Sequence, residues 1–186
     1  MSAHGHVDPS NRKVALLIAV LALFLALAET FGKSAQTEAL SRNIEASNLW
    51  SFFQAKTIRM TTVRTAVEEA ELQLASAAAE AKPAIAKRID EWRKAAARYD
   101  SEPDTREGRK ELAARAKEAE TKRDHSLAAY HQFETASAAL QIAIVLASAE
   151  VITGVGYLLW MSAGLGIVGL AFTVIGFVAP SAVHLF

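Results

Sequence analysis

The chain has 186 residues, and its 20 Lys and Arg balance its 20 Asp and Glu, so the formal net charge is zero. A neutral chain offers no reason to expect the basic face that nucleic-acid binding needs. The absence of cysteine excludes a disulfide framework, a thiolate metal site and a thiol nucleophile. Most charges lie between Glu29 and Glu134, and apolar blocks flank them at residues 14–28 and 136–179. This layout predicts an all-α integral membrane protein with a helical insert.

The residue pattern of the N-terminal region indicates a polar tail followed by a membrane anchor. Residues 1–12 are polar and are expected to be disordered. Arg12 and Lys13 precede the first apolar block, and Glu29 leads directly into a helical pattern, so an uncleaved signal anchor is favoured over a signal peptide. We therefore expect the first transmembrane helix over residues 13–32, close to the length of roughly 20 residues that a span needs.

Beyond this anchor, mostly apolar residues recur at steps of three and four, the period of a coiled-coil helix. We call such a series of residues a seam. The seam consists of Leu49, Phe53, Lys56, Met60, Val63, Val67, Ala70, Leu74 and Ala77. No proline or glycine occurs over residues 33–81, so the membrane helix is expected to continue through them. Pro83 is expected to break or kink it, because proline removes a backbone donor and clashes with the preceding turn.

A short helix over residues 84–99 and a polar turn over residues 100–105 are expected next. A second seam then runs back with the same period, through Leu112, Ala116, Ala119, Arg123, Ser126, Tyr130, Phe133, Ser137 and Leu140. The two seams therefore predict that residues 33–135 form a long antiparallel, coiled-coil-like helical hairpin. This hairpin would form a stalk between the first and second transmembrane helices.

The C-terminal apolar block has the length of two spans of roughly 20 residues. We expect transmembrane helices over residues 136–153 and 158–179, with the turn at residues 154–157 or, alternatively, at residues 160–164. Pairs of small residues suit close helix packing in lipid, namely Ala143/Ala147, Ala149/Thr153 and Gly169/Thr173. Gly164-x-Gly166-x-x-Gly169 has the glycine spacing of a dinucleotide-binding motif. No strand precedes it, so no cofactor is predicted.

Residues 44–58, which read Ile-Glu-Ala-Ser-Asn-Leu-Trp-Ser-Phe-Phe-Gln-Ala-Lys-Thr-Ile, resemble the signature of domain-of-unknown-function family 4337. A second stretch of likeness covers residues 133–153, with Leu-Gln-Ile-Ala-Ile-Val-Leu-Ala-Ser at its centre. The resemblance implies a small bacterial membrane protein and brings no assigned activity with it. Members of the family tend to carry basic residues in the turn between the last two spans, where this chain has Gly154-Val155-Gly156.

The expected location is the bacterial inner membrane, with several spans. The positive-inside rule counts basic residues close to the spans. The basic residues that flank the insert slightly favour a cytoplasmic insert; they are Lys33, Arg42, Lys122 and Arg123. The first span and the family's basic turn instead favour a cytoplasmic N-terminus and an extracytoplasmic insert, which is the orientation we expect.

Two carboxylates, Glu29 and Glu150, lie in or near apolar spans, where a charge costs roughly 2.5–3.5 kcal/mol at the bilayer centre. They could form an ion or proton site, but their positions near span ends favour an interfacial role. A separate cluster, Trp50, Phe53, Gln54 and Lys56, could dock a partner, although aromatic residues at helical spacing are more often core.

His131 and Glu134 are expected to form a polar girdle at the membrane boundary. Together with His125 they could be read as a metal site, but the Glu-x-x-His order of di-iron bundles is reversed here and occurs once, which argues against one. His4 and His6 could bind copper beside a free terminal amine, a pattern that also occurs by chance. We predict no metal site and no cofactor.

The sequence favours a structural or interaction protein that self-associates, because a single hairpin offers little core. Its partners would be the lipid bilayer and further copies of itself, with an unidentified protein as a further candidate. The alternative is a small oligomeric ion channel or transporter subunit that uses Glu29 or Glu150. No nucleophile–base constellation or phosphate-binding loop is present in the sequence, so we predict that the chain is not an enzyme.

Overall fold

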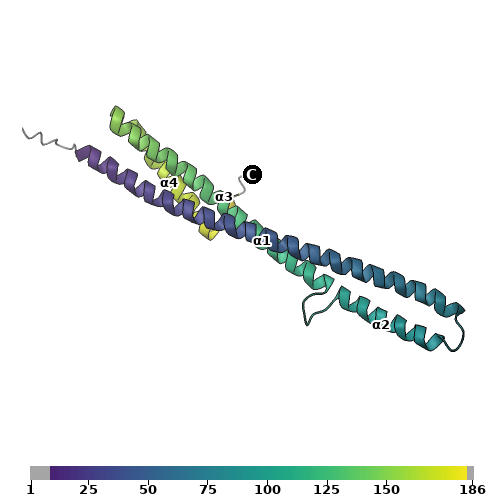
Figure 1. The fold of residues 1–186 in the computed structure, drawn as a ribbon. Helices are drawn as coiled ribbons and strands as arrows, with labels where there is room; N and C mark the ends of the chain where they lie inside the picture. The colour runs from purple at the N-terminus through teal and green to yellow at the C-terminus, as the bar shows by residue number, and fades with distance from the viewer. Residues whose placement is uncertain (1–8, 184–186) are drawn as a thin grey trace, which may run out of the picture. The chain divides into compact units, whose positions relative to one another are not determined.

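The computed structural model describes residues 9–183, which form four α-helices and a short 3-10 helix and contain no strand (Figure 1). The elements are α1 (Pro9–Ser76), α2 (Lys82–Asp100), α3 (Arg109–Thr153), α4 (Tyr157–Val178) and the 3-10 helix η1 (Pro180–Ala182). The predicted all-α class is confirmed. Three of the helices, α1, α3 and α4, are long and apolar enough to cross a membrane.

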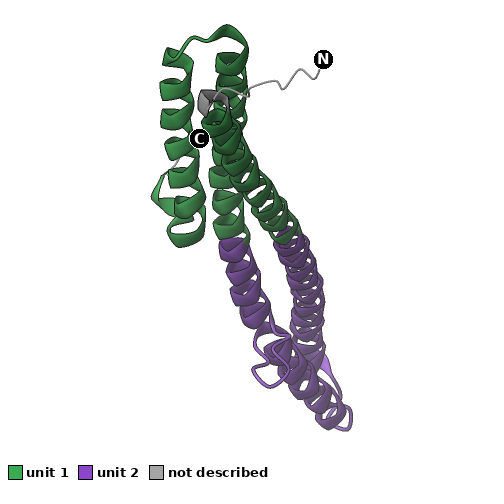
Figure 2. Cartoon of the chain, turned by 90° about the vertical axis from the view of Figure 1, so that its left-hand side faces the viewer, with its two compact units in different colours: residues 1–40, 123–186 green, residues 41–122 purple. Residues whose placement is uncertain are grey.

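The chain divides into two compact units (Figure 2). Unit 1 comprises residues 1–40 and 123–186, and unit 2 comprises residues 41–122. Helices α1 and α3 each contribute residues to both units, α4 belongs to unit 1, and α2 belongs to unit 2.

In unit 1, α1, α3 and α4 share one apolar core. Its buried residues are Leu21, Ala28, Ala136, Leu140 and Ala143, with Leu165 and Phe172 packed against them. The residues of α4 that are buried are all small, namely Ser162, Gly166, Gly169, Thr173 and Gly176. A Cβ atom at Gly166 would lie 2.8 Å from Leu21 Cδ2, and one at Gly169 would lie 2.7 Å from Leu140 Cγ. The helices therefore approach closely because these positions lack a side chain.

In unit 2, α1 packs against two helices in succession. Near residue 46 it packs against α3, through a cluster of Ala46, Leu49, Leu112, Ala116 and Ala119. Farther along it packs against α2, through a cluster of Val67, Ala70 and Ile89. Every residue of both seams expected from the sequence is buried or half-buried within the single chain. The seams are therefore used inside the chain, so they are not free to bind a second copy.

The bounds of α1 and the beginning of α2 differ from the expectation. Helix α1 begins at Pro9, so residues 9–12 are helical where a disordered tail was expected, and proline is favourable in a first helical turn. Residues 1–8, which include His4 and His6, lie outside the described part. Helix α1 already ends at Ser76, and Pro83 lies in the first turn of α2, where its fixed φ suits a helix start. Of the expected break or kink, the structure shows a break, at residues 77–81 just before the proline, and Pro83 begins the next helix.

The turn between the last two long helices lies at residues 154–156. Gly154 adopts a φ of +68°, a left-handed conformation that glycine reaches without strain and that commonly ends helices. Its N–H donates to Glu150 O at 2.8 Å. The alternative turn at residues 160–164 lies inside α4.

Candidate functional site

The aromatic part of the motif around Trp50 lies in the core of unit 2. Trp50 Nε1 donates to Glu120 Oε1 of α3 at 2.8 Å, and its ring meets Phe53 edge-on with 5.4 Å between centroids. Gln54, one turn after Trp50, is exposed. The motif thus joins α1 to α3, and only Gln54 of its four candidate residues is fully available to a partner.

Lys56 occupies a buried position on the seam, with 9% of its surface exposed. Its Nζ lies 3.9 Å from Glu102 Oε2 and 3.7 Å from Glu107 Oε2. The same ammonium lies 5.7 Å from the centre of the Tyr99 ring. A lysine on a helical seam needs a carboxylate within reach, and Lys56 finds two in the loop between α2 and α3.

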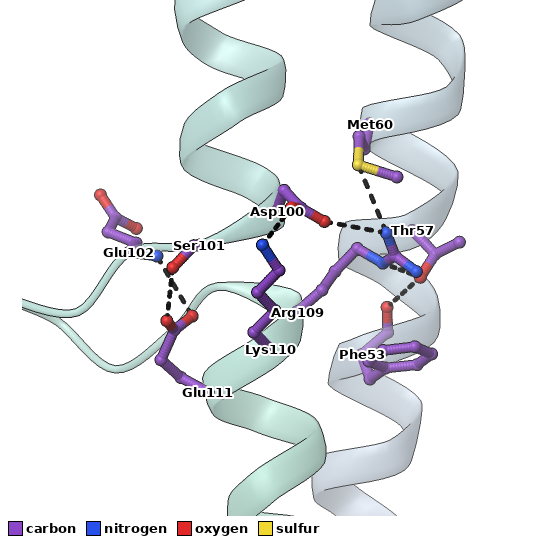
Figure 3. Close-up of polar contacts among 9 residues, drawn as sticks. All are labelled: Phe53, Thr57, Met60, Asp100, Ser101, Glu102, Arg109, Lys110 and Glu111. Atoms are coloured by element: carbon purple, nitrogen blue, oxygen red, sulfur yellow. Dashed lines mark hydrogen bonds and ion pairs between the residues drawn. The ribbon is translucent and has the colours of Figure 1, made fainter.

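Arg109, the first residue of α3, connects all three helices of unit 2 (Figure 3). Its Nε donates to Thr57 Oγ1 of α1 at 2.9 Å, and its Nη1 donates to Asp100 Oδ1 of α2 at 3.2 Å. The guanidinium also lies over the Phe53 ring, 5.1 Å from its centre. The planar, forked guanidinium can make these contacts together, whereas a lysine ammonium could not.

Glu111 closes the same junction from the other side (Figure 3). Its Oε1 accepts from Ser101 Oγ at 2.6 Å, and its Oε2 accepts from the Glu102 N–H at 3.1 Å. Gly108 is buried beneath these contacts, and its carbonyl accepts the first hydrogen bond of α3, from Leu112 N. Gly108, Arg109 and Glu111 were not among the residues predicted from the sequence. An acidic residue three positions after a cap residue is a helix-start signal that could have pointed to Glu111.

Three carboxyl groups at this junction favour their charged forms. The hydrogen bond from Lys110 lowers the pKa of Asp100, and the charges of Lys110 and Arg109 lower it further. The hydrogen bond from Arg98 lowers the pKa of Glu102, and that from Ser101 lowers the pKa of Glu111. Each depressed pKa stabilises the folded junction while the carboxyl stays ionised.

The fold of unit 2 is therefore expected to lose stability in acid. A depressed folded pKa contributes fully above the unfolded values of roughly 3.9 for Asp and 4.3 for Glu, and the contribution is lost as pH falls through the folded values. We expect the thermal midpoint, followed by circular dichroism, to be level from about pH 7 to pH 5 and to fall below that. Asp100→Asn should weaken this dependence. An unchanged acid slope in Asp100→Asn would contradict the assignment.

The two candidate membrane carboxylates lie in different surroundings in unit 1. Glu29 is exposed, and its Oε1 accepts from Gln141 Nε2 of α3 at 3.1 Å. Glu150 is half-buried near the end of α3, and its Oε2 is buried with no hydrogen-bond partner among the described residues. The structure therefore pairs Glu29 with an amide, while Glu150 keeps an unpaired oxygen.

The two segments expected at the membrane boundary lie together in unit 1 and form a groove between α1 and α3. Its floor is formed by Ala28, Gly32 and Phe133. Its rim is formed by Glu29, Lys33, Gln36, Tyr130, Glu134 and Ser137. Tyr130 Oη donates to Glu134 Oε1 at 3.3 Å, and His131 Nδ1 lies 3.8 Å from Glu134 Oε2. His125 is exposed and does not line this groove.

Gln132 of α3 is a buried polar residue that no pattern in the sequence singled out. It is 1% exposed, and its Nε2 donates to the carbonyl oxygens of Pro180 at 3.0 Å and Val183 at 2.8 Å. A cluster of Phe31, Phe133 and Phe177 joins α1, α3 and α4 in the same unit. Because Gln132 and Pro180 are far apart in sequence, no local pattern could have paired them.

Residues 10–179 match the model of a family described as a domain of unknown function (DUF4337). The chain belongs to this family. The match includes both stretches on which the resemblance was based, so the assignment to DUF4337 is confirmed. No curated protein and no solved structure matches the chain. Membership of DUF4337 brings no assigned activity.

Proposed function

We propose that this chain is a multi-pass protein of the bacterial inner membrane that serves a structural or interaction role by associating with copies of itself. Three helices of sufficient length and apolarity support the membrane part. Their outward surfaces carry large exposed apolar residues, which lipid would cover, including Leu16, Leu23, Val145, Ile167 and Val178. The proposal assigns no catalytic activity and no cofactor to the chain.

The observation that carries self-association is a second stripe on α1, which the sequence analysis overlooked. Ile44, Ser51, Ile58, Thr65 and Leu72 recur at every seventh position, and all five are exposed. The fractions exposed are 53% for Ile44, 67% for Ile58 and 76% for Leu72. These five positions lie about half a turn around α1 from the buried seam, so the stripe faces away from α2 and α3. Exposed aliphatic residues at this spacing can form one of the two contact positions per heptad through which helices pair.

The partner that fits this stripe is α1 of a second copy, running parallel. Anchoring both copies in one membrane through the same helix gives them the same direction. In that arrangement Ile44, Ile58 and Leu72 meet their own counterparts. Arg64 and Glu69 flank the stripe five positions apart, the spacing at which residues of parallel heptad helices form ion pairs between copies. Charge and apolar spacing therefore both favour the parallel pair.

Cysteine cross-linking tests this interface cleanly because the chain contains no cysteine. Ile58→Cys is expected to give a disulfide-linked dimer in native membranes under mild oxidation, since the two positions would face each other. Lys87→Cys on α2, where the side chain is also highly exposed, should give little or none. Equal yields of disulfide-linked dimer from the two variants would show that the stripe is not the interface.

The orientation that we propose places the N-terminus in the cytoplasm and the insert outside it. Lys87 is exposed on α2, which lies within the insert, so Lys87→Cys should be accessible to reagents. We expect a membrane-impermeant maleimide to label this variant in cells with a permeabilised outer membrane and an intact inner one. Labelling that requires rupture of the inner membrane would reverse the orientation.

A second candidate function, a small ion channel or transporter subunit, is favoured by the unpaired oxygen of Glu150. A buried carboxylate oxygen without a donor is costly, and lining a polar path between several copies would satisfy it. Glu150→Gln should then reduce ion flux into proteoliposomes while assembly stays intact. Unchanged flux in this variant, or no flux in the parent chain, would remove the channel proposal and leave the structural one.

A further inference from the structure

We infer that the groove between α1 and α3 in unit 1 binds the headgroup of a zwitterionic phospholipid that carries a primary ammonium, the phosphoethanolamine class. This inference rests on the proposed membrane location. The groove lies where the first apolar block ends and charged residues begin, which is where headgroups meet a spanning helix. Its apolar floor, formed by Ala28, Gly32 and Phe133, continues toward the apolar parts of α1 and α3.

The rim carries the charges that such a headgroup needs. Lys33 is exposed, has no ion-pair partner among the described residues, and can meet a phosphate. Glu29 and Glu134 are exposed on the two helices of the groove and can accept from an ammonium. Each accepts one hydrogen bond within the chain, from Gln141 and from Tyr130, but an ionised carboxylate offers about four acceptor positions.

The groove is narrow at its base because Gly32 allows α1 to approach α3. A Cβ at Gly32 would lie 3.3 Å from Phe133 Cβ, closer than ordinary van der Waals contact. The buried ring of Phe133 fills the base, so an occupant must lie along the rim. A lipid that runs parallel to the helices, with its headgroup among Lys33, Glu29 and Glu134, satisfies this geometry.

The charge balance selects among lipid classes. One ammonium and two carboxylates give the rim a net negative charge, which disfavours an anionic headgroup such as phosphoglycerol. A choline headgroup has the same net charge as ethanolamine but has no N–H group to donate to Glu29 or Glu134. A primary ammonium has three such donors. The expected order of binding is therefore phosphoethanolamine, then phosphocholine, then phosphoglycerol.

Native mass spectrometry of the full chain, titrated with phosphatidylethanolamine, phosphatidylcholine or phosphatidylglycerol, tests this order. Lys33→Ala and Glu134→Gln should each weaken phosphatidylethanolamine binding roughly tenfold, the size of one lost charge-assisted contact. The matched controls Lys87→Ala and Glu91→Gln, an exposed ion pair of α2, should leave it unchanged. Both groove side chains are exposed, so the helical content should remain intact by circular dichroism.

Equal binding of the three lipids, or variants that bind as the parent chain does, would overturn the headgroup site. If a variant loses its helical content, the preference of the parent chain among the three lipids still decides the question. A chain that fails to insert into membranes would overturn the proposed function itself. Insertion without a lipid preference would overturn only this inference, so the two failures are distinguishable.

Discussion

Gly108→Ala is expected to destabilise the junction between α2 and α3 by about 3 kcal/mol. The added Cβ would overlap with Glu111 Oε2 and Glu102 N and would lie 2.6 Å from Ser101 Cα. Two of these atoms belong to the backbone, so a side-chain rotation cannot relieve the clash. Either the loop moves or Glu111 releases its hydrogen bonds to Ser101 and Glu102.

Limited trypsin digestion at Arg106, which lies in this loop, gives a local measurement. A loss of about 3 kcal/mol corresponds to a rise of roughly a hundredfold in the population of the open loop, and cleavage should rise with it. The control is Gly164→Ala, since a Cβ at Gly164 meets no atom within 4 Å. Cleavage of Gly108→Ala at the rate of the control would show that the loop absorbs the methyl group.

Gly169→Val is expected to weaken the packing of α4 against α3 by about 2–3 kcal/mol. A Cβ at this position would lie 2.7 Å from Leu140 Cγ and 3.1 Å from the backbone oxygen of Ala136. Valine adds two further carbons on a stiff side chain, so Leu140 cannot simply turn away. In lipid, close approach between small residues is a main source of helix association, and this substitution removes it.

The measurement is the free energy of unfolding in mixed detergent and dodecyl sulfate micelles, followed by circular dichroism. Gly164→Ala again serves as the control and should be neutral or slightly stabilising, because alanine favours helix. Gly169→Val with the stability of the parent chain would mean that α4 does not pack on α3 through its glycines.

The helices of this chain follow from its sequence because their apolar residues repeat with a regular period. The seam positions from Leu49 to Ala77 and from Leu112 to Leu140 are all buried or half-buried, as a helical period requires. The end of α3 was also accessible to prediction, since Gly154 is the residue that a left-handed helix end prefers. What these features share is that neighbouring residues alone decide them.

Other features depend on contacts that sequence spacing does not reveal. Helix α1 ends before a turn at residues 77–81. This turn contains neither glycine nor proline, so no helix-breaking residue in it predicted the end of α1. Position 108 must be glycine because a Cβ there would collide with the backbone of residues 101 and 102. Gln132 donates to carbonyl oxygens beyond α4. The exposed stripe on α1 had a visible period, but Ser51 and Thr65 interrupt its aliphatic residues and conceal it beside the stronger buried seam.

The central claim, a membrane-anchored chain that associates with itself, is tested most directly by its mass in its own membrane. The full chain would be extracted into lipid nanodiscs without detergent and weighed by native mass spectrometry. One chain contributes 20.0 kDa. We expect particles that contain two or more chains, and we expect charged substitutions at Ile44, Ile58 and Leu72 together to reduce them to one. Particles with a single parent chain at every expression level would contradict self-association, and absence of the chain from the nanodiscs would contradict the membrane anchor.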